Sequence, residues 1–238
     1  TLIGFDSCCY KNNDLERKEV RLEFGWFPKK KKKIKREEIE IRMETPEDYY
    51  VVELVTKQAF WNKYRLGCDE HYLVHKLRNS NDYLPKLSRI AVKDGELLGC
   101  IMYSKAIVID GEKEHDVVTF GPLCVAPKWQ GYGIGEILLK GTMKLAKNEG
   151  YNGIVIFGEP EYYPRIGFKT CDHFNIKTED GKNFDAFMAY ELNKDSMNGI
   201  KGRFYESKVF EDLQQEDVEE YDKKFPFMKK LRFPGQWN

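Results

Sequence analysis

The chain is 238 residues long, which is enough for one well-formed core and an added subdomain. It carries 39 basic and 39 acidic side chains, and this zero net charge gives no overall attraction to nucleic acid or to a membrane surface. No apolar run is long enough to cross a bilayer as a helix, so we expect neither a membrane nor a nucleic acid as partner.

Targeting signals and cysteine spacing give an expectation for the compartment. The first 20 residues lack the charged, apolar and small-residue regions of a signal peptide. The six cysteines show no C-x-x-C spacing, and an even count in a chain of this length does not imply a disulfide framework. We therefore predict a reduced protein of the cytoplasm.

Residues 1–36 differ in character from the rest and form a predicted N-terminal extension with a lysine-rich linker. Residues 29–33 are an unbroken lysine run, which Lys35 and Arg36 extend. Like charges in a block repel one another, so we interpret this run as a solvated linker. Binding to nucleic acid is the weaker alternative, because no aromatic residues are interleaved with the basic ones. Residues 20–27 alternate partly in polarity and could form an added strand.

A first strand and two helices are predicted next. Residues 38–43 alternate as a strand does. Thr45-Pro46-Glu47-Asp48 is typical of a helix start, with a threonine cap, a proline in the first position and acids in the first turn. A second helix is predicted over residues 69–78, where His71 and His75 are spaced for a possible metal pair. No third ligand or H-E-x-x-H pattern accompanies them, so we predict no metal site.

A run of strands follows the two helices. Residues 87–92 and 96–109 flank the turn dipeptide Asp94-Gly95 and predict a β-hairpin. Asp110-Gly111 marks another turn, which leads to a strand over residues 117–125. Two later strands are predicted over residues 153–157 and 184–192.

A glycine-rich turn and an amphipathic helix stand between these strands. The turn reads Gln130-Gly131-Tyr132-Gly133-Ile134-Gly135, and the apolar residues after it recur with helical spacing as far as Gly150. A helix N-terminus presents free backbone N–H groups and the positive end of the helix dipole, which together favour a bound phosphate. We therefore predict a phosphorylated ligand at residues 131–135.

Three ligand classes use glycine-rich turns of this kind. The dinucleotide fingerprint needs G-x-G-x-x-G, whereas the spacing here is G-x-G-x-G. The phosphate loop of nucleotide hydrolases needs G-x-x-x-x-G-K-[ST], which the chain lacks. The Q/R-x-x-G-x-G/A pattern of acyl-CoA-dependent N-acyltransferases is matched by Gln130, Gly133 and Gly135. A plain glycine-rich turn without a ligand is the remaining alternative.

Two flanking motifs extend the acyltransferase match. Leu123-Cys124-Val125 precedes the turn, and Tyr163-Pro164-Arg165-Ile166-Gly167-Phe168 follows the strand over residues 153–157 with a Y-x-x-x-G-F pattern. In order and spacing the chain resembles the GNAT superfamily of acetyl-CoA-dependent N-acetyltransferases over about residues 40–192. The resemblance implies an α/β (α+β) GNAT fold, with a mixed central β-sheet of about six to seven strands flanked by helices. The GNAT domain would span residues 37–192.

The resemblance also implies acetyl-CoA as co-substrate, without a metal, and assigns roles to residues. The turn would bind the CoA pyrophosphate through Gln130, Gly131, Tyr132, Gly133, Ile134 and Gly135. The strand before it would pair with the pantetheine arm and polarise the thioester carbonyl through a main-chain N–H, using Leu123, Cys124 and Val125. Tyr163 would protonate the departing thiolate, with Tyr162 as the alternative. We interpret the Cys124 side chain as a small buried hydrophobe and not as a nucleophile.

The general base is the least defined part of the predicted site. Glu159 and Glu161 follow the strand over residues 153–157, and a carboxylate there could take a proton through water. The alternative is that both are acids in an exposed helix start with Pro160 in its first position. We select Glu159. Where many family members have an asparagine, this chain has Gly158-Glu159-Pro160, so any contact attributed to that asparagine is in doubt.

Residues 193–238 form a predicted C-terminal extension. An acidic stretch with helical character is followed by basic and aromatic residues, which favour docking on the core. The alternatives are a cover over the acceptor site and a contact in a homodimer.

The sequence as a whole predicts an N-acetyltransferase that moves an acetyl group from acetyl-CoA to a primary amine by direct transfer. Direct transfer follows from the resemblance and from the lack of a persuasive Cys/His nucleophile pair. A non-catalytic GNAT-fold sensor or interaction module that binds an acyl-CoA is the alternative. The sequence does not specify the acceptor.

Overall fold

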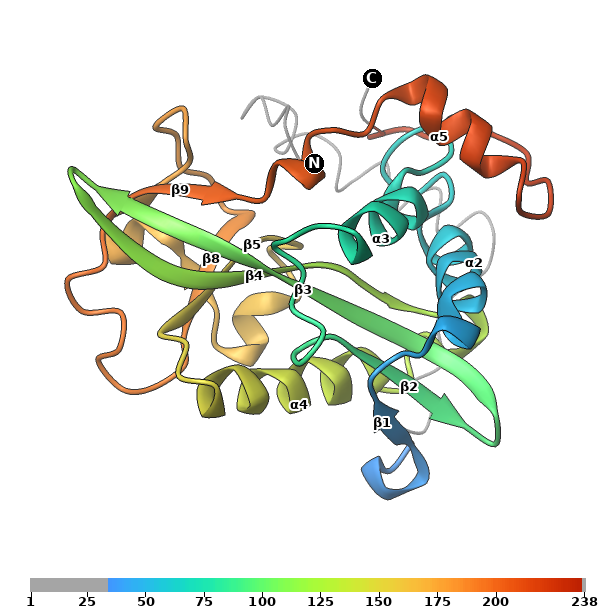
Figure 1. The fold of residues 1–238 in the computed structure, drawn as a ribbon, viewed down its shortest axis with the longest axis horizontal. Helices are drawn as coiled ribbons and strands as arrows, with labels where there is room; N and C mark the ends of the chain where they lie inside the picture. Colours follow the sequence, from blue (N-terminus) through green and yellow to red (C-terminus); the bar gives the residue numbers. More distant parts are fainter. Residues whose placement is uncertain (1–33, 237–238) are drawn as a thin grey trace.

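The computed structural model describes residues 34–236 (Figure 1). The lysine run at residues 29–33 and the possible strand over residues 20–27 lie outside the described residues. Within them, the chain folds around one mixed β-sheet, with α4 on one face and α2 and α3 on the other (Figure 1).

The sheet has nine strands in the part of the chain that the structure describes. Its main path runs β1-β2-β3-β4-β5-β8-β6, and β9 pairs with both β3 and β7. Only the β4–β5 and β7–β9 pairs are parallel. The strands are β1 Glu40–Arg42, β2 Arg89–Lys93, β3 Glu96–Asp110, β4 Lys113–Val125, β5 Gly153–Phe157, β6 Lys169–Thr170, β7 Ile176–Lys177, β8 Phe187–Glu191 and β9 Gly202–Glu206.

This sheet is larger than the six to seven strands expected, for two reasons. β6 and β7 have two residues each, which is too short for any alternation to show in the sequence. β9 belongs to the C-terminal extension, yet it joins the sheet by pairing with residues 106–109 of β3.

The α-helices of the described chain are α2 Tyr49–Phe60, α3 Glu70–Arg78, α4 Ile134–Asn148 and α5 Gln215–Asp222. Three of the short 3-10 segments matter below, namely η2 Pro46–Asp48, η4 Tyr163–Ile166 and η6 Lys208–Phe210. α4 buries its apolar stripe against the sheet, with Leu138 wholly inaccessible and in the same cluster as Ile154. Burial of one such leucine contributes about 1.5–3 kcal/mol.

The start of the first helix follows the predicted pattern. Pro46 opens the 3-10 turn η2, and α2 continues directly from it. The Asp48 carboxylate accepts hydrogen bonds from Arg42 Nη1 at 2.6 Å and Nη2 at 2.8 Å, and from the Thr45 N–H at 2.7 Å. These bonds fix the entry of the helix against β1.

β4 and β5 separate after a short contact. Their parallel pairing is confined to Val118 and Ile154. Beyond this pair, β4 continues to Val125 beside β3, and β5 continues to Phe157 beside β8. One edge of β4 therefore has no strand partner among the described residues after Val118, and its polar backbone groups on that side can bind a ligand.

Candidate active site

The glycine-rich turn connects the open end of β4 to the N-terminus of α4. Gly133 is the N-cap residue of α4 with a φ of +90°, and Gly131 has a φ of +84°. Residues with a side chain rarely adopt this left-handed conformation, so the turn depends on these two glycines. Gln130 Nε2 donates to the Val125 carbonyl at 3.1 Å, which ties the turn to the end of the strand.

The backbone of the turn is arranged to hold an anion. The first bond of α4 runs from the Ile137 N–H to the Gly133 carbonyl at 3.1 Å. The N–H groups of Gly133, Ile134 and Gly135 donate to no acceptor among the described residues, as expected at a helix N-terminus. The positive end of the helix dipole lies at the same point. The turn therefore fits a phosphate group.

The strand that leads into this turn presents alternate backbone groups to the gap between β4 and β5. The Ala126 N–H donates to the Leu98 carbonyl at 2.8 Å, so residue 126 faces β3. Because polar groups alternate sides along a strand, those of Leu123 and Val125 point away from β3 and into the gap. The Cys124 side chain is buried, as expected, with its Sγ 3.5 Å from Thr56 Oγ1.

Tyr163 is the first residue of η4 and lies where β4 and β5 separate. Its ring contacts Phe120 and Phe168, with centroid distances of 5.9 and 5.4 Å. A Cβ at Gly158 would collide with this ring, so the glycine after β5 makes room for it. Burial raises the pKa of Tyr163 above its ordinary value, and the nearby Tyr162 adds to this effect. The phenol therefore carries its proton at neutral pH.

The neighbouring Tyr162 has a different environment. Its hydroxyl lies near the glycine-rich turn, 3.6 Å from where a Cβ on Gly135 would stand. The guanidinium of Arg165 lies 5.9 Å from the Tyr162 ring centroid. Of the two tyrosines, Tyr162 is thus placed beside the phosphate-binding turn and Tyr163 at the divergence of the strands.

Glu159 has a hydrogen-bond partner that the sequence did not indicate. The Tyr64 hydroxyl, from the connection between α2 and α3, donates to Glu159 Oε1 at 2.7 Å. Burial raises the pKa of Tyr64, and the negative charge of Glu159 raises it further. Tyr64 therefore keeps its proton and remains a hydrogen-bond donor to the Glu159 carboxylate.

Glu70, the first residue of α3, is a second carboxylate that the sequence did not single out. It interacts electrostatically with Tyr64, and with Cys124 on the ligand strand. Burial raises the pKa of Glu70 to about 7, and the neighbouring Asp69 adds to the shift. No short motif marks Tyr64, which meets Glu159 only through the packing of the α2–α3 region on the sheet.

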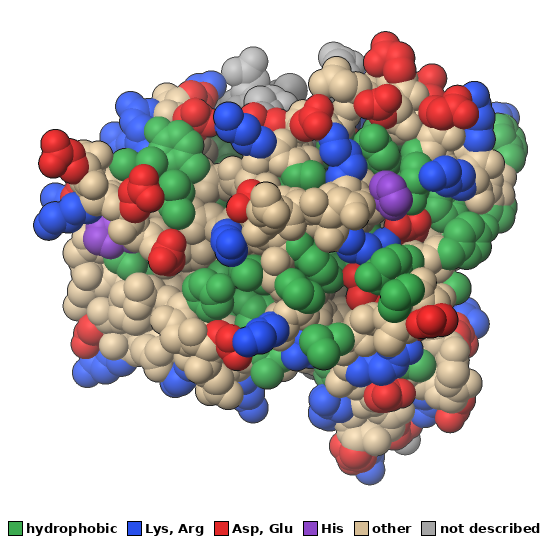
Figure 2. Space-filling model, in the orientation of Figure 1, with side chains coloured by type: hydrophobic (Ala, Val, Ile, Leu, Met, Phe, Trp, Pro, Cys, Tyr) green, Lys and Arg blue, Asp and Glu red, His purple; other side chains and the backbone are tan. Residues whose placement is uncertain are grey.

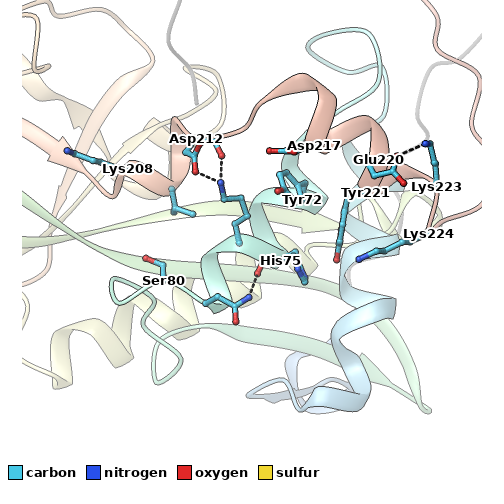
Figure 3. Close-up of a pocket in the computed structure, with 13 residues that line it drawn as sticks. Tyr72, His75, Ser80, Lys208, Asp212, Asp217, Glu220, Tyr221, Lys223 and Lys224 are labelled. Carbon is cyan, nitrogen blue, oxygen red and sulfur yellow. Dashed lines mark hydrogen bonds and ion pairs between the residues drawn. The ribbon is translucent and has the colours of Figure 1, made fainter.

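A separate open pocket of about 840 Å³ lies between α3, η6 and the C-terminal segment (Figure 3). None of the predicted site residues lines it. Two pairs of its charged side chains are formed within the pocket, Lys76 with Asp212 and Lys223 with Glu220 (Figure 3).

The histidine pair of α3 packs against the C-terminal segment and the neighbouring helix. His71 Nε2 lies 2.9 Å from Asp222 Oδ1, and His75 Nδ1 lies 3.4 Å from Glu53 Oε1. Within residues 34–236, no group of three or more His, Cys, Asp or Glu side chains is arranged to hold a metal ion.

The surface charge and the length of the helices bear on possible partners. On the face drawn in Figure 2, basic and acidic side chains are interspersed, and acidic ones gather over α5. None of the described helices has the length and the apolar character needed to span a bilayer.

Comparison with known sequences defines the class. Residues 39–168 match the model of the Acetyltransferase (GNAT) family, which is more than half of the chain. The protein therefore belongs to the GNAT family of acetyltransferases. It is 28% identical over 163 residues to the uncharacterized N-acetyltransferase YhbS of Escherichia coli K12, which covers 68% of this chain and 92% of YhbS. It is also 31% identical over 100 residues to the uncharacterized N-acetyltransferase YjhQ of the same strain, covering 42% and 55% of the two chains.

Solved structures agree with this class. The crystal structure of YhbS from Escherichia coli in complex with CoA has a TM-score of 0.65 and 25% identity, and covers 74% of this chain and 94% of its own. A GNAT acetyltransferase from Brucella melitensis in complex with acetyl-CoA has a TM-score of 0.58 and 27% identity, covering 72% and 97%. The GNAT fold expected from the sequence is confirmed.

Proposed function

We propose that this protein transfers an acetyl group from acetyl-CoA to a primary amine by direct attack of the amine. The observation that supports this most is the convergence of three features at one end of the sheet. The anion-binding turn at the N-terminus of α4, the open edge of β4 and the protonated Tyr163 all lie where β4 and β5 separate. Two similar proteins were crystallised with CoA or acetyl-CoA, which is consistent with such a ligand here.

The residues of the turn and of β4 would bind and orient the co-substrate. Backbone N–H groups of residues 131–135 would hold the pyrophosphate. The groups of Leu123 and Val125 that point into the gap would pair with the pantetheine arm, and a main-chain N–H would polarise the carbonyl at which charge develops. When bound, acetyl-CoA supplies an activated acetyl thioester.

Two proton transfers complete the reaction. Tyr163 holds a proton on its hydroxyl at neutral pH and would donate it to the departing sulfur. The acceptor reaches the site as an ammonium ion, which has no lone pair, so it must lose a proton before it attacks, and a carboxylate could take that proton directly or through water. Glu159, which the sequence favoured, accepts a hydrogen bond from Tyr64 and is our candidate for this base.

Calorimetry with acetyl-CoA, desulfo-CoA and NADH tests the binding part of this proposal. We expect micromolar affinity for the CoA compounds and none for NADH, because the turn lacks the dinucleotide spacing. Thiol release is then measured with a panel of primary amines, comprising spermidine, tyramine, lysine and a lysine-containing peptide. Thiol release that depends on the amine supports the enzyme. Tight binding without thiol release by any amine would indicate the alternative, a non-catalytic acyl-CoA-binding module.

A further inference from the structure

Residues 229–236 of the C-terminal extension lie on the connection between α2 and α3. The Lys229 carbonyl accepts a hydrogen bond from Asn62 Nδ2 at 2.9 Å. The Gln236 side-chain amide donates to the carbonyl of Asn62, and to that of Arg65 at 3.3 Å. These bonds join the end of the described chain to the residues that come directly after α2.

Asn62 is the residue through which the two parts are connected. It is buried, and its φ of +57° is a left-handed conformation that asparagine adopts more readily than most residues. Its N–H donates to the Gly67 carbonyl at 2.8 Å, and its Oδ1 accepts from the Gly67 N–H at 2.9 Å, which closes residues 62–67 into a loop. The same Oδ1 accepts from the Leu231 N–H at 3.1 Å. One side chain thus closes the 62–67 loop and binds the C-terminal segment to it.

The C-terminal segment also packs closely on the 62–67 loop. Gly67 is buried, with a φ of +72°. A Cβ at this position would stand 3.2 Å from Lys230 Cε and 3.5 Å from the Trp61 ring. Because the two parts fit together without spare room, the loop cannot shift unless the segment moves as well.

The 62–67 loop carries the tyrosine that binds the candidate base. The Tyr64 hydroxyl donates to Glu159 Oε1 at 2.7 Å, across from the end of β5. A hydrogen bond to one carboxylate oxygen favours a single orientation of the whole group. A continuous series of contacts therefore runs from the C-terminal segment through Asn62 and Tyr64 to Glu159.

We propose that Asn62 and residues 229–236 position Tyr64, and through it Glu159, for the acetyl transfer. This inference rests on the proposed function. Asn62 is a positioning residue, because it closes the loop that presents the tyrosine hydroxyl to the carboxylate. A displacement of about 1 Å at a reacting group can cost a large factor in rate, so a loop fixed at both ends matters for catalysis.

Asn62→Gly is the variant that tests this role in the full chain. Glycine adopts the left-handed conformation, so only the side-chain bonds are lost. We expect kcat/KM for the best amine of the panel to fall about 10-fold. The affinity for CoA, measured by calorimetry, should stay within about threefold of the wild-type value, because the glycine-rich turn is not part of this series of contacts.

Asn175→Gly is the matched control. Asn175 is exposed and has a left-handed φ of +56°, so the same substitution is made in the same backbone conformation. This variant should have the wild-type kcat/KM. If Asn62→Gly also kept the wild-type value, the inference would be wrong, and the proposed acetyl transfer would stand.

A double-mutant cycle with Tyr64→Phe distinguishes positioning from a general loss of stability. Tyr64→Phe alone should cause a loss of about the same size as Asn62→Gly. If Asn62 acts through Tyr64, the variant with both substitutions should be no slower than Tyr64→Phe, within about threefold. Losses that multiply would show that Asn62 acts independently of Tyr64, and would overturn the inference.

Hydrogen exchange in the full chain provides a test that needs no acceptor and no turnover. Gln236→Glu keeps the oxygen that accepts from the Phe233 N–H, but it places a carboxylate against the carbonyls of Asn62 and Arg65. It changes nothing in the 62–67 loop itself. If the C-terminal segment holds this loop, the backbone amides of residues 62–67 should exchange faster in this variant, as they should in Asn62→Gly.

The two kinds of measurement separate the inference from the proposed function. Unchanged exchange of residues 62–67 in Gln236→Glu would show that the C-terminal segment does not hold the loop, and the inference would fail even where acetyl transfer is observed. If the wild-type protein releases thiol with no amine, the proposed function fails, and the catalytic part of this inference fails with it. The exchange rates would then still decide whether the segment positions the loop.

Discussion

At the scale of single residues, the two adjacent tyrosines allow a sharp test of the leaving-group role. Tyr163 is packed between Phe120 and Phe168, whereas Tyr162 lies beside Gly135. Tyr163→Phe keeps the ring and removes only the proton donor, so we expect kcat to fall about 100-fold. Steady-state thiol release measures kcat, and calorimetry with CoA measures the binding affinity. The affinity for CoA should stay within about threefold of the wild-type value, since the substitution leaves the glycine-rich turn unchanged.

Tyr162→Phe is the natural control, because it removes a hydroxyl of the same kind one residue away. We expect its kcat to remain within about threefold of the wild-type value. Equal losses in the two variants would mean that neither hydroxyl acts alone. Full activity of Tyr163→Phe would rule out the protonation step assigned to it.

Those parts of the candidate site that lie in short sequence motifs could be predicted from the sequence. Gly133 adopts the left-handed conformation that the glycine spacing suggested, and Tyr163 lies at the separation of the strands. Tyr64 was missed for a physical reason. Tyr64 meets Glu159 across 95 positions of the chain, and such a contact leaves no trace in local spacing. Cys124 was predicted correctly to be buried, since small apolar side chains fit a strand that helices cover on both faces.

At the scale of elements, the glycine that caps helix α4 and a glycine in the middle of that helix have opposite requirements. Gly133 has a φ of +90° at the N-cap, whereas Gly141 lies in the middle of the helix with open space around its Cα. Gly133→Ala should cost about 1–2 kcal/mol and weaken acetyl-CoA binding, because alanine resists the left-handed conformation. Gly141→Ala should instead stabilise the protein by up to about 1 kcal/mol, since alanine favours a helix. Thermal unfolding measures the stability of each variant, and calorimetry measures its affinity for acetyl-CoA.

The acetyl-CoA affinities of Gly133→Ala and Gly141→Ala test whether the backbone conformation of the turn matters for ligand binding. If both alanine variants bound acetyl-CoA as the wild-type protein does, the glycine conformation at residue 133 would be irrelevant to the ligand. A loss of affinity confined to Gly133→Ala would connect the backbone of the turn to the phosphate.

The start of α2 makes a pH-dependent contribution to stability. Hydrogen bonds from Arg42 lower the pKa of Asp48 to about 2, against the effect of burial. Because the folded pKa lies below the unfolded value of about 3.9, the contribution is present above pH 4 or so and is lost as pH falls towards 2. Both side chains are partly exposed, so we expect about 1 kcal/mol at neutral pH.

Asp48→Asn measures this contribution. Urea unfolding at a series of pH values should show a gap between the wild-type protein and the variant that is constant near neutrality and shrinks below about pH 4. A gap of the same size at every pH would assign the effect to packing and not to the Arg42 ion pair.

The regular elements were largely predictable because apolar runs and turn residues mark them. The long strands β3 and β4 are mostly buried and are bounded by the turns at Asp94-Gly95 and Asp110-Gly111, and α4 carries an apolar stripe, so these patterns are visible in a single sequence. β9 was missed because Gly202–Glu206 is short and lies in a charged extension. Its place beside β3 is decided by tertiary pairing, which outweighs local preference.

At the scale of the whole molecule, the C-terminal segment is connected to the first two helices through buried polar groups. The Tyr221 hydroxyl donates to Glu53 Oε2 at 2.7 Å, and Lys57 Nζ lies 2.9 Å from Asp222 Oδ1. Lys57 is only 1% exposed, so its ammonium group depends on this carboxylate. Phe225 adds a stacked contact with Tyr50 at 5.2 Å, whereas Phe227 stays exposed. The segment is therefore held by ionic contacts with α2 and α3, and also by hydrogen bonds from Trp61 and Asn62 to the Lys229 carbonyl.

Substitution of Asp222 should therefore lower the stability of the protein more than substitution of an exposed carboxylate does. Burial raises its pKa, but the bonds with His71 and Lys57 outweigh this effect, so the pKa lies below its ordinary value. Asp222→Asn keeps the shape and leaves a buried ammonium group without a counter-charge, which typically costs about 3–5 kcal/mol. We expect the midpoint of thermal unfolding to fall by about 10 °C.

Asp217→Asn is the matched control, since it makes the same change on the exposed side of α5 and should shift stability by less than about 0.5 kcal/mol. A double variant, Asp222→Asn with Lys57→Met, separates the two possible causes. If the loss arises from the unpaired charge, removing Lys57 as well should recover part of the stability, because an apolar side chain needs no partner. If Asp222→Asn were as stable as Asp217→Asn, the buried ion pair would contribute nothing to the docking of the segment, and its other contacts, among them those of Tyr221, Phe225 and Lys229, would hold it.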